Sequence, residues 1–232
     1  MRVLLVNPNT STSTTCAMVA MVERELPGVT VCGLTVERGP AMLVDEASLA
    51  AAAAETVHAV NTSVELAGSD AVIVAAFGDP GMDALAEALP IPVVGIGSAS
   101  MLEAAETIGR FGIATTTPAL RESIHEQVRA LGLADHLACI EITPGDPLLL
   151  ASDPASQTEA LTSAIGAALT RGARGVVIGG GPLGDSADEL SSLIAVPVIN
   201  PVRAACRRVR TLLGRAAEQD GAAATARPRS GG

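Results

Sequence analysis

Short apolar runs alternate along this chain with longer stretches in which apolar and polar residues recur at helical spacing. The apolar runs predict strands at residues 2–6, 29–34, 71–75, 93–96, 112–114, 139–142, 176–178 and 198–199. The stretches between them predict helices at residues 13–26, 47–68, 80–88, 99–108, 120–131, 156–171, 187–193 and 202–218. Such alternation is typical of an α/β fold with parallel sheets, in which the apolar strands are covered on both faces.

The pattern repeats within the chain. Residues 70–96 and 175–201 each contain an apolar run, a Gly/Pro-rich turn, a helical stretch and a Pro-Val strand, at an offset of about 105 residues. Residues 2–11 pair in the same way with residues 111–120. We therefore predict two pseudo-symmetric lobes with a cleft between them. The first would comprise residues 1–96 and 200–219, the second residues 97–199, and a disordered tail would follow at 220–232.

Composition narrows the possible partners. The 232 residues include no Trp or Tyr and only two Phe, so the core is expected to be aliphatic and base stacking is disfavoured. The net charge of −10 argues against binding to nucleic acid or anionic membranes. Scattered cysteines without a CxxC pair indicate buried, reduced thiols and a cytoplasmic protein rather than a zinc site. We see no signal peptide, membrane span or metal-binding motif.

Small polar residues gather where the predicted strands end. In a parallel sheet these carboxyl ends meet at one edge, where ligands bind. The candidate substrate-binding residues are Asn7, Thr10, Ala76, Phe77, Gly78, Ser98, Thr115, Thr116, Thr117, Gly180, Gly181 and Pro182. Their N–H groups and hydroxyls suit a carboxylate, an amide or a ring carbonyl. Alternatively, these segments are only tight turns and helix caps. We expect a small, polar pocket wall in which Phe77 is the only aromatic residue.

Five segments resemble the aspartate/glutamate/hydantoin racemase superfamily, and most closely its hydantoin and allantoin racemases. They are LLVNPNTS at residues 4–11, FGDPGMDAL at 77–85, PVVGI at 92–96, the threonines at 115–117 and PVINPVRAAC at 197–206. The resemblance implies two α/β lobes, no cofactor and a homo-oligomer.

The resemblance also implies two opposed cysteines that remove and return a proton at an acidic carbon. One would directly precede FGDPG, where this chain has Ala76, and the other would align with Gly180. Asn200 likewise stands where the racemases tend to have Asp, and Ser98 stands where their sequence continues toward Glu. The four cysteines that are present (Cys16, Cys32, Cys139 and Cys206) are interpreted as small buried residues. The two-cysteine mechanism therefore does not follow from this sequence.

Asp79 is the candidate proton carrier. A carboxylate at the mouth of a partly dry cleft can have a raised pKa and act as a base. Alternatively, Asp79 caps a helix that begins at Pro80. Nucleotide binding is disfavoured because the chain contains no Lys and the turn at residues 179–182 lacks the GxGxxG pattern.

Two functions remain open. The first is a cofactor-independent enzyme, racemase-like or carrying out a related lyase or hydrolytic step, that acts on a small cyclic ureide, imide or carboxylate. The second is a catalytically silent small-molecule-binding protein with the same fold.

Overall fold

Two parallel sheets of four strands each form the framework of the molecule. The computed structural model describes residues 1–225, with side chains through Arg215. The first sheet has the order β2 (Thr30–Thr35), β1 (Arg2–Asn7), β3 (Ala71–Val74), β4 (Val93–Gly95). The second has the order β6 (Leu137–Ile142), β5 (Phe111–Thr115), β7 (Val176–Ile178), β8 (Val198–Ile199). Matching β1 to β5 makes the two orders identical, so the α/β class and the tandem repeat are confirmed.

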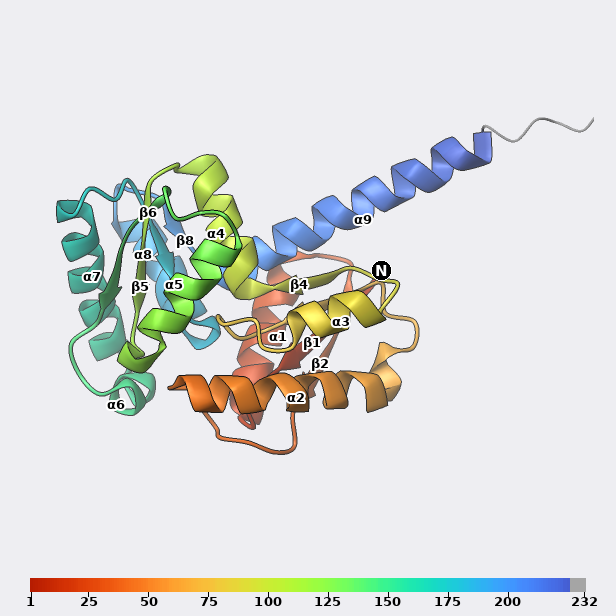
Figure 1. Ribbon diagram of the computed structural model, residues 1–232, viewed down its shortest axis with the longest axis horizontal. Helices are drawn as coiled ribbons and strands as arrows, with labels where there is room; N and C mark the ends of the chain where they lie inside the picture. The colour runs from red at the N-terminus through yellow and green to blue at the C-terminus, as the bar shows by residue number, and fades with distance from the viewer. Residues whose placement is uncertain (226–232) are drawn as a thin grey trace, which may run out of the picture.

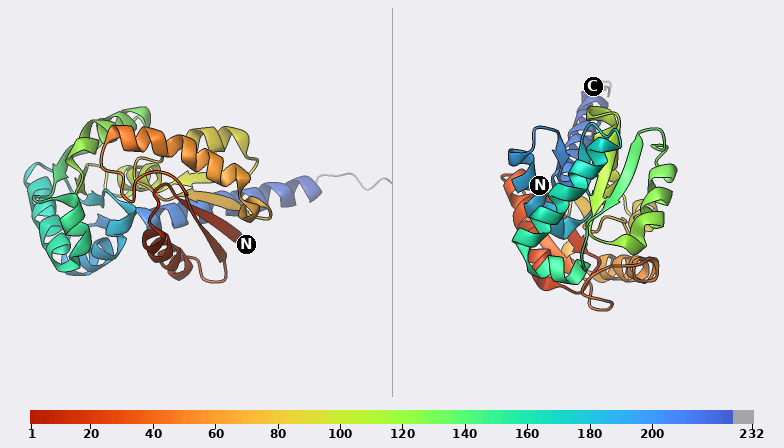
Figure 2. Two further views of the ribbon diagram at one scale, coloured as in Figure 1. Left: turned by 90° about the horizontal axis from the view of Figure 1, so that it is seen from below. Right: turned by 90° about the vertical axis from the view of Figure 1, so that its left-hand side faces the viewer.

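Helices cover both sheets (Figures 1 and 2). They are α1 (Thr12–Glu25), α2 (Glu46–Thr62), α3 (Met82–Ala88), α4 (Ile96–Thr107), α5 (Arg121–Ala130), α6 (Pro147–Ser152), α7 (Pro154–Thr170), α8 (Gly184–Leu193) and α9 (Pro201–Thr225). The chain passes from the first sheet to the second through α4. The far end of α9 extends away from the rest of the molecule (Figure 1).

The core follows from the alternation of side chains along each strand. In β1, Val3 and Leu5 pack in one cluster with α1, α4 and α9, while Leu4 and Val6 face the opposite way, toward α2. The first cluster continues into the second sheet through Phe111 and Ile113 of β5. Because apolar side chains from both sheets form this one cluster, the two halves pack directly on each other.

Several elements differ from the sequence-based expectations. The helix predicted at residues 47–68 ends at Thr62, and α8 begins at Gly184 rather than at residue 187. Helix α4 begins at Ile96, so Gly97 and Ser98 lie in its first turn rather than in a loop. Helix α6 was not predicted; Asp146 caps it and Pro147 occupies its first position, a standard helix start. Residues 220–225, expected in the disordered tail, continue α9, in keeping with the helix propensity of Ala222–Ala224. Residues 226–232 lie outside the described part of the chain.

No helix among the described residues is both long and apolar enough to cross a membrane.

Candidate functional site

A cavity lies where the two matching turns meet. Residues 76–78 follow β3 and residues 179–182 follow β7, and both turns line the same cavity. Its volume open to the centre of a water molecule is about 80 Å³. The predicted cleft between Ala76 and Gly180 is therefore present, and its walls come from the carboxyl ends of strands in both sheets.

Eight of the predicted binding residues line this cavity, namely Ala76, Phe77, Gly78, Thr116, Thr117, Gly180, Gly181 and Pro182. Five of the candidate residues are not among its lining, namely Asn7, Thr10, Asp79, Ser98 and Thr115. Asn9 lines it instead of Asn7. Asn7 is fully buried, and its side-chain amide donates to Asn9 Oδ1 at 2.9 Å, so it shapes the loop that carries Asn9.

The wall is more apolar than expected. Met42, Leu43 and Leu49 cover one side, and Leu120 and Leu183 add further apolar surface. The expectation of a small polar wall was therefore wrong, although Phe77 is the only aromatic residue in the lining. Met42 and Leu43 lie in the loop between β2 and α2, so they are apolar without belonging to the buried face of a strand or helix. Two apolar residues in a loop were the sequence signal that could have indicated a cavity wall.

Helix α6 and Gln157 complete the lining. Pro147 and Ala151 of α6 face the cavity, as does Gln157 of α7. Gln157 is buried, and its Oε1 accepts a hydrogen bond from Ser186 Oγ at 3.0 Å. Sequence reasoning missed these residues because α6 was not predicted and because Gln157 is one of several polar residues on a long helix.

Backbone N–H groups are the main polar feature of the two turns. Within the described residues, the N–H groups of Phe77, Gly78 and Gly181 donate to no protein acceptor. The Gly180 N–H, by contrast, donates to Ile178 O at 3.1 Å. In the second turn, the unpaired donor is therefore on Gly181 rather than on Gly180.

Thr115 holds the second turn in place. Its hydroxyl donates to Gly179 O at 2.7 Å and lies 3.2 Å from Thr117 Oγ1. Thr115 is fully buried, so it supports the turn from behind and leaves Thr116 and Thr117 to line the cavity.

Asp79 caps α4 from behind the first turn. Its carboxylate accepts hydrogen bonds from Gly97 N at 2.8 Å and Ser98 N at 2.6 Å. Gln127 of α5 donates a third, at 2.9 Å. Burial raises the pKa of Asp79 to about 7, although the two backbone N–H groups lower it. Helix α3 begins later, at Met82, with Gly81 as its N-cap, so Asp79 does not cap the helix that follows it.

The cysteines lie elsewhere. None of the four is among the cavity-lining residues, all of which fall in the described part of the chain. Burial raises the pKa of Cys206 to about 12 and that of Cys139 to about 11. Only Cys206 is buried, and Cys32 and Cys139 are partly exposed, which corrects the expectation that all four are buried. Cys16 is exposed on α1. It follows the buried Thr15, and its own side chain lies on the outward face of the helix.

Residues 3–209 match the Asp/Glu/Hydantoin racemase family. The chain belongs to this family. It is 31% identical over 215 residues to a hydantoin racemase from Paenarthrobacter aurescens. The aligned region covers 92% of this chain and 91% of the relative.

Solved structures of racemases in this family share the fold closely. The allantoin racemase from Klebsiella pneumoniae superposes with a TM-score of 0.87 at 28% identity, over 93% of this chain and 89% of that one. The allantoin racemase from Pseudomonas fluorescens has the same TM-score at 27% identity, over 93% and 92% of the two chains. The resemblance inferred from the five sequence segments is therefore confirmed at the level of family and fold.

Proposed function

We propose that this chain is a cofactor-independent, racemase-like enzyme acting on a small cyclic ureide or imide, without the two-cysteine mechanism. The observation that carries the proposal is the pair of turns with unpaired N–H groups across one cavity. The family relationship to hydantoin and allantoin racemases supports the same substrate class. A neutral ring fits better than a carboxylate, because no cationic side chain is among the lining residues.

The two turns would stabilise negative charge as it develops on the substrate. When the C–H bond of an acidic ring carbon breaks, its electron pair moves onto the neighbouring carbonyl oxygen. The N–H groups of Phe77, Gly78 and Gly181 are fixed donors for that oxygen, and fixed donors need no rearrangement during reaction. In this proposal, solvent water takes the proton and returns one to either face of the ring carbon.

A second candidate is the silent binding protein. One observation favours it: no ionisable side chain is found among the cavity-lining residues, all of which are described. A two-base reaction needs such groups within hydrogen-bond reach of the substrate, whereas a binding protein does not.

Hydrogen exchange separates the two candidates. The protein is incubated in D₂O with enantiopure 5-benzylhydantoin, and loss of the C5 proton is followed by ¹H NMR against a protein-free blank. Calorimetry measures binding in parallel. Exchange above the blank supports the enzyme, and binding without exchange supports the silent protein. If neither occurs, the proposed substrate class is wrong.

Two glycine variants provide the matched comparison. A Cβ added at Gly181 would lie 2.7 Å from Sδ of the fully buried Met18 and 3.3 Å from the backbone oxygen of Ala75, so Gly181→Ala should displace the second turn and weaken binding. A Cβ at Gly166, on the exposed surface of α7, meets nothing within 4 Å. Gly166→Ala should therefore bind like the parent protein.

A further inference from the structure

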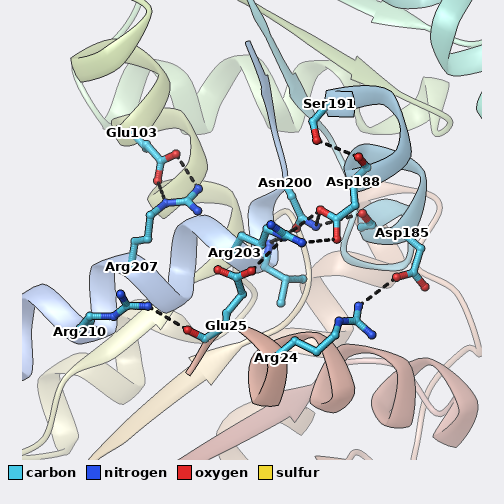
Figure 3. A network of polar contacts seen from close by, with 12 residues as sticks. Arg24, Glu25, Glu103, Asp185, Asp188, Ser191, Asn200, Arg203, Arg207 and Arg210 are labelled. Carbon is cyan, nitrogen blue, oxygen red and sulfur yellow. Dashed lines mark hydrogen bonds and ion pairs between the residues drawn. The ribbon is translucent and has the colours of Figure 1, made fainter. Parts of the chain in front are cut away.

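Asn200 uses every hydrogen-bonding position of its side chain. It lies between β8 and α9 and is 4% exposed. Its Oδ1 accepts from Val202 N at 2.9 Å and from Arg203 N at 3.3 Å, which caps α9. Its amide nitrogen donates to Gly184 O at 3.0 Å. It also donates to Asp188 Oδ1 at 2.9 Å (Figure 3). A side chain satisfied in this way is held in one orientation.

The Gly184 carbonyl lies two residues after the second turn. Gly184 begins α8 immediately after the cavity-lining residues Gly180–Leu183. The same segment also packs against α1. A Cβ at Gly184 would lie 2.6 Å from Met21 Sδ and 3.3 Å from Asn200 Nδ2. The start of α8, which follows the second turn directly, is therefore in contact with both Met21 of α1 and Asn200.

Charge fixes which way the Asn200 amide points. Asp188 of α8 accepts from the Asn200 amide and also pairs with Arg203 of α9, at 2.9 Å. Arg203 in turn lies 3.2 Å from Glu25 Oε1, at the end of α1 (Figure 3). Because the group facing position 200 is a carboxylate, an amide donor is favoured there, and an acid would place two carboxylates side by side.

We propose that Asn200 is a positioning residue for the second turn, whose link to Gly184 O and Asp188 sets where the Gly181 N–H points in the cavity. This inference rests on the proposed function, in which the Gly181 N–H binds the substrate. The position of the turn, however, can be measured without any substrate.

Two variants remove the donated hydrogen bonds and keep the cap of α9. Asn200→Ser retains an oxygen that can accept at the N-cap, but its side chain is too short to reach Gly184 O. Asn200→Asp retains the cap and brings a second carboxylate toward Asp188. Glu103→Gln is the matched control: it breaks the Arg207–Glu103 pair at 2.7 Å, which joins α9 to α4 and does not contact the turn.

The first readout is a ¹H–¹⁵N correlation spectrum of the labelled protein. We expect the amide signals of Gly180, Gly181 and Gly184 to move in both Asn200 variants and to stay in place in Glu103→Gln. The double variant Asn200→Asp with Asp188→Asn restores a donor–acceptor pair between the two positions, so its signals should return part of the way. Unmoved Gly180 and Gly181 signals in both Asn200 variants would overturn the proposal.

The second readout is binding of 5-benzylhydantoin by calorimetry. Misplacing one N–H donor should raise the dissociation constant about threefold to tenfold in the Asn200 variants, with no change in Glu103→Gln. Moved amide signals with unchanged affinity would refute the positioning role. If the parent protein does not bind the probe at all, the proposed function fails, while the spectrum still decides whether Asn200 positions the turn.

Discussion

At the scale of single residues, Asp79 has an unusual backbone. It is the only residue other than glycine with a positive φ among those described, at 49°, and it is 7% exposed. Such conformations persist where surrounding contacts over-determine them. Here the three hydrogen bonds from Gly97, Ser98 and Gln127 do so. They join the first turn to α4 and, through Gln127, to α5. This geometry favours a structural role for Asp79 over its predicted role as a proton carrier.

Asp79 should make stability depend on pH. Its pKa is raised from 3.8 to about 7 in the folded protein. Between these values the folded state holds a proton that the unfolded state has lost, so the free energy of unfolding falls as pH rises from 4 to 7. Between pH 5 and pH 8, the free energy of unfolding of the parent protein should fall by about 2–3 kcal/mol more than that of Asp79→Asn. Urea unfolding at both pH values measures this difference.

An exposed carboxylate provides the control for that measurement. Asp135 is exposed in the segment before β6, so Asp135→Asn should keep the same pH dependence as the parent protein. A parent protein and an Asp79→Asn variant with equal pH dependence would show that Asp79 is ionised to the same degree in the folded and unfolded states.

The two positions without cysteine allow a gain-of-function test. Gly180 has an extended backbone with φ of 170°, and a Cβ there would lie 3.1 Å from Leu183 Cδ1, a flexible contact. Ala76 already has a Cβ in the cavity lining. We expect Ala76→Cys with Gly180→Cys to racemise L-5-benzylhydantoin at least about tenfold faster than the parent protein, since positioned acid–base groups contribute that much or more.

Polarimetry measures this gain in racemisation rate, and alkylation shows whether it depends on the two introduced thiols. Iodoacetamide should abolish the gain in the double variant, whereas in the parent protein it should modify the exposed Cys16 and leave hydantoin binding unchanged. A parent protein that racemises as fast as the double variant would mean that another residue already moves the proton.

At the scale of elements, the start of α4 is pressed against the first turn. A Cβ at Gly97 would lie 1.8 Å from Phe77 O, a backbone atom that cannot move without shifting the turn. Gly97→Ala should therefore lower the free energy of unfolding by about 1–3 kcal/mol and weaken hydantoin binding. Gly166→Ala should instead raise stability by about 0.5–1 kcal/mol, because alanine favours the helix and the site is open. Equal stability of the two variants in thermal unfolding would contradict this packing.

Most elements could be predicted because the apolar strands and the turn residues are strong local signals. The start of α4 could not, since Gly97 and Ser98 are weak helix formers whose helical conformation depends on the distant Asp79 carboxylate. Helix α6 was not predicted from the sequence because it is short and because Leu148 and Leu149 point outward, with 61% and 70% of each residue exposed. Its apolar residues therefore do not follow the pattern of a buried face.

At the scale of the whole molecule, the internal repeat explains the position of the cavity. Two sheets with the same strand order place the β3 and β7 turns at corresponding points, and one continuous core packs the two halves together. The repeat in the sequence predicted the positions of both turns, at residues 76–78 and 179–182. It could not predict Leu49, Pro147 or Gln157, because these residues reach the cavity through the folding of connections that carry no repeat signal.

The most direct test of the account is a crystal structure with bound 5-benzylhydantoin. We predict that the ring lies between the turns at 76–78 and 179–182, with a ring oxygen about 3 Å from the N–H nitrogen of Phe77, Gly78 or Gly181. The benzyl group should contact Leu43 or Leu49 of the apolar wall. A ring bound elsewhere, such as the surface groove lined by Arg38, Glu55 and His58, with the cavity between the turns empty, would contradict the account.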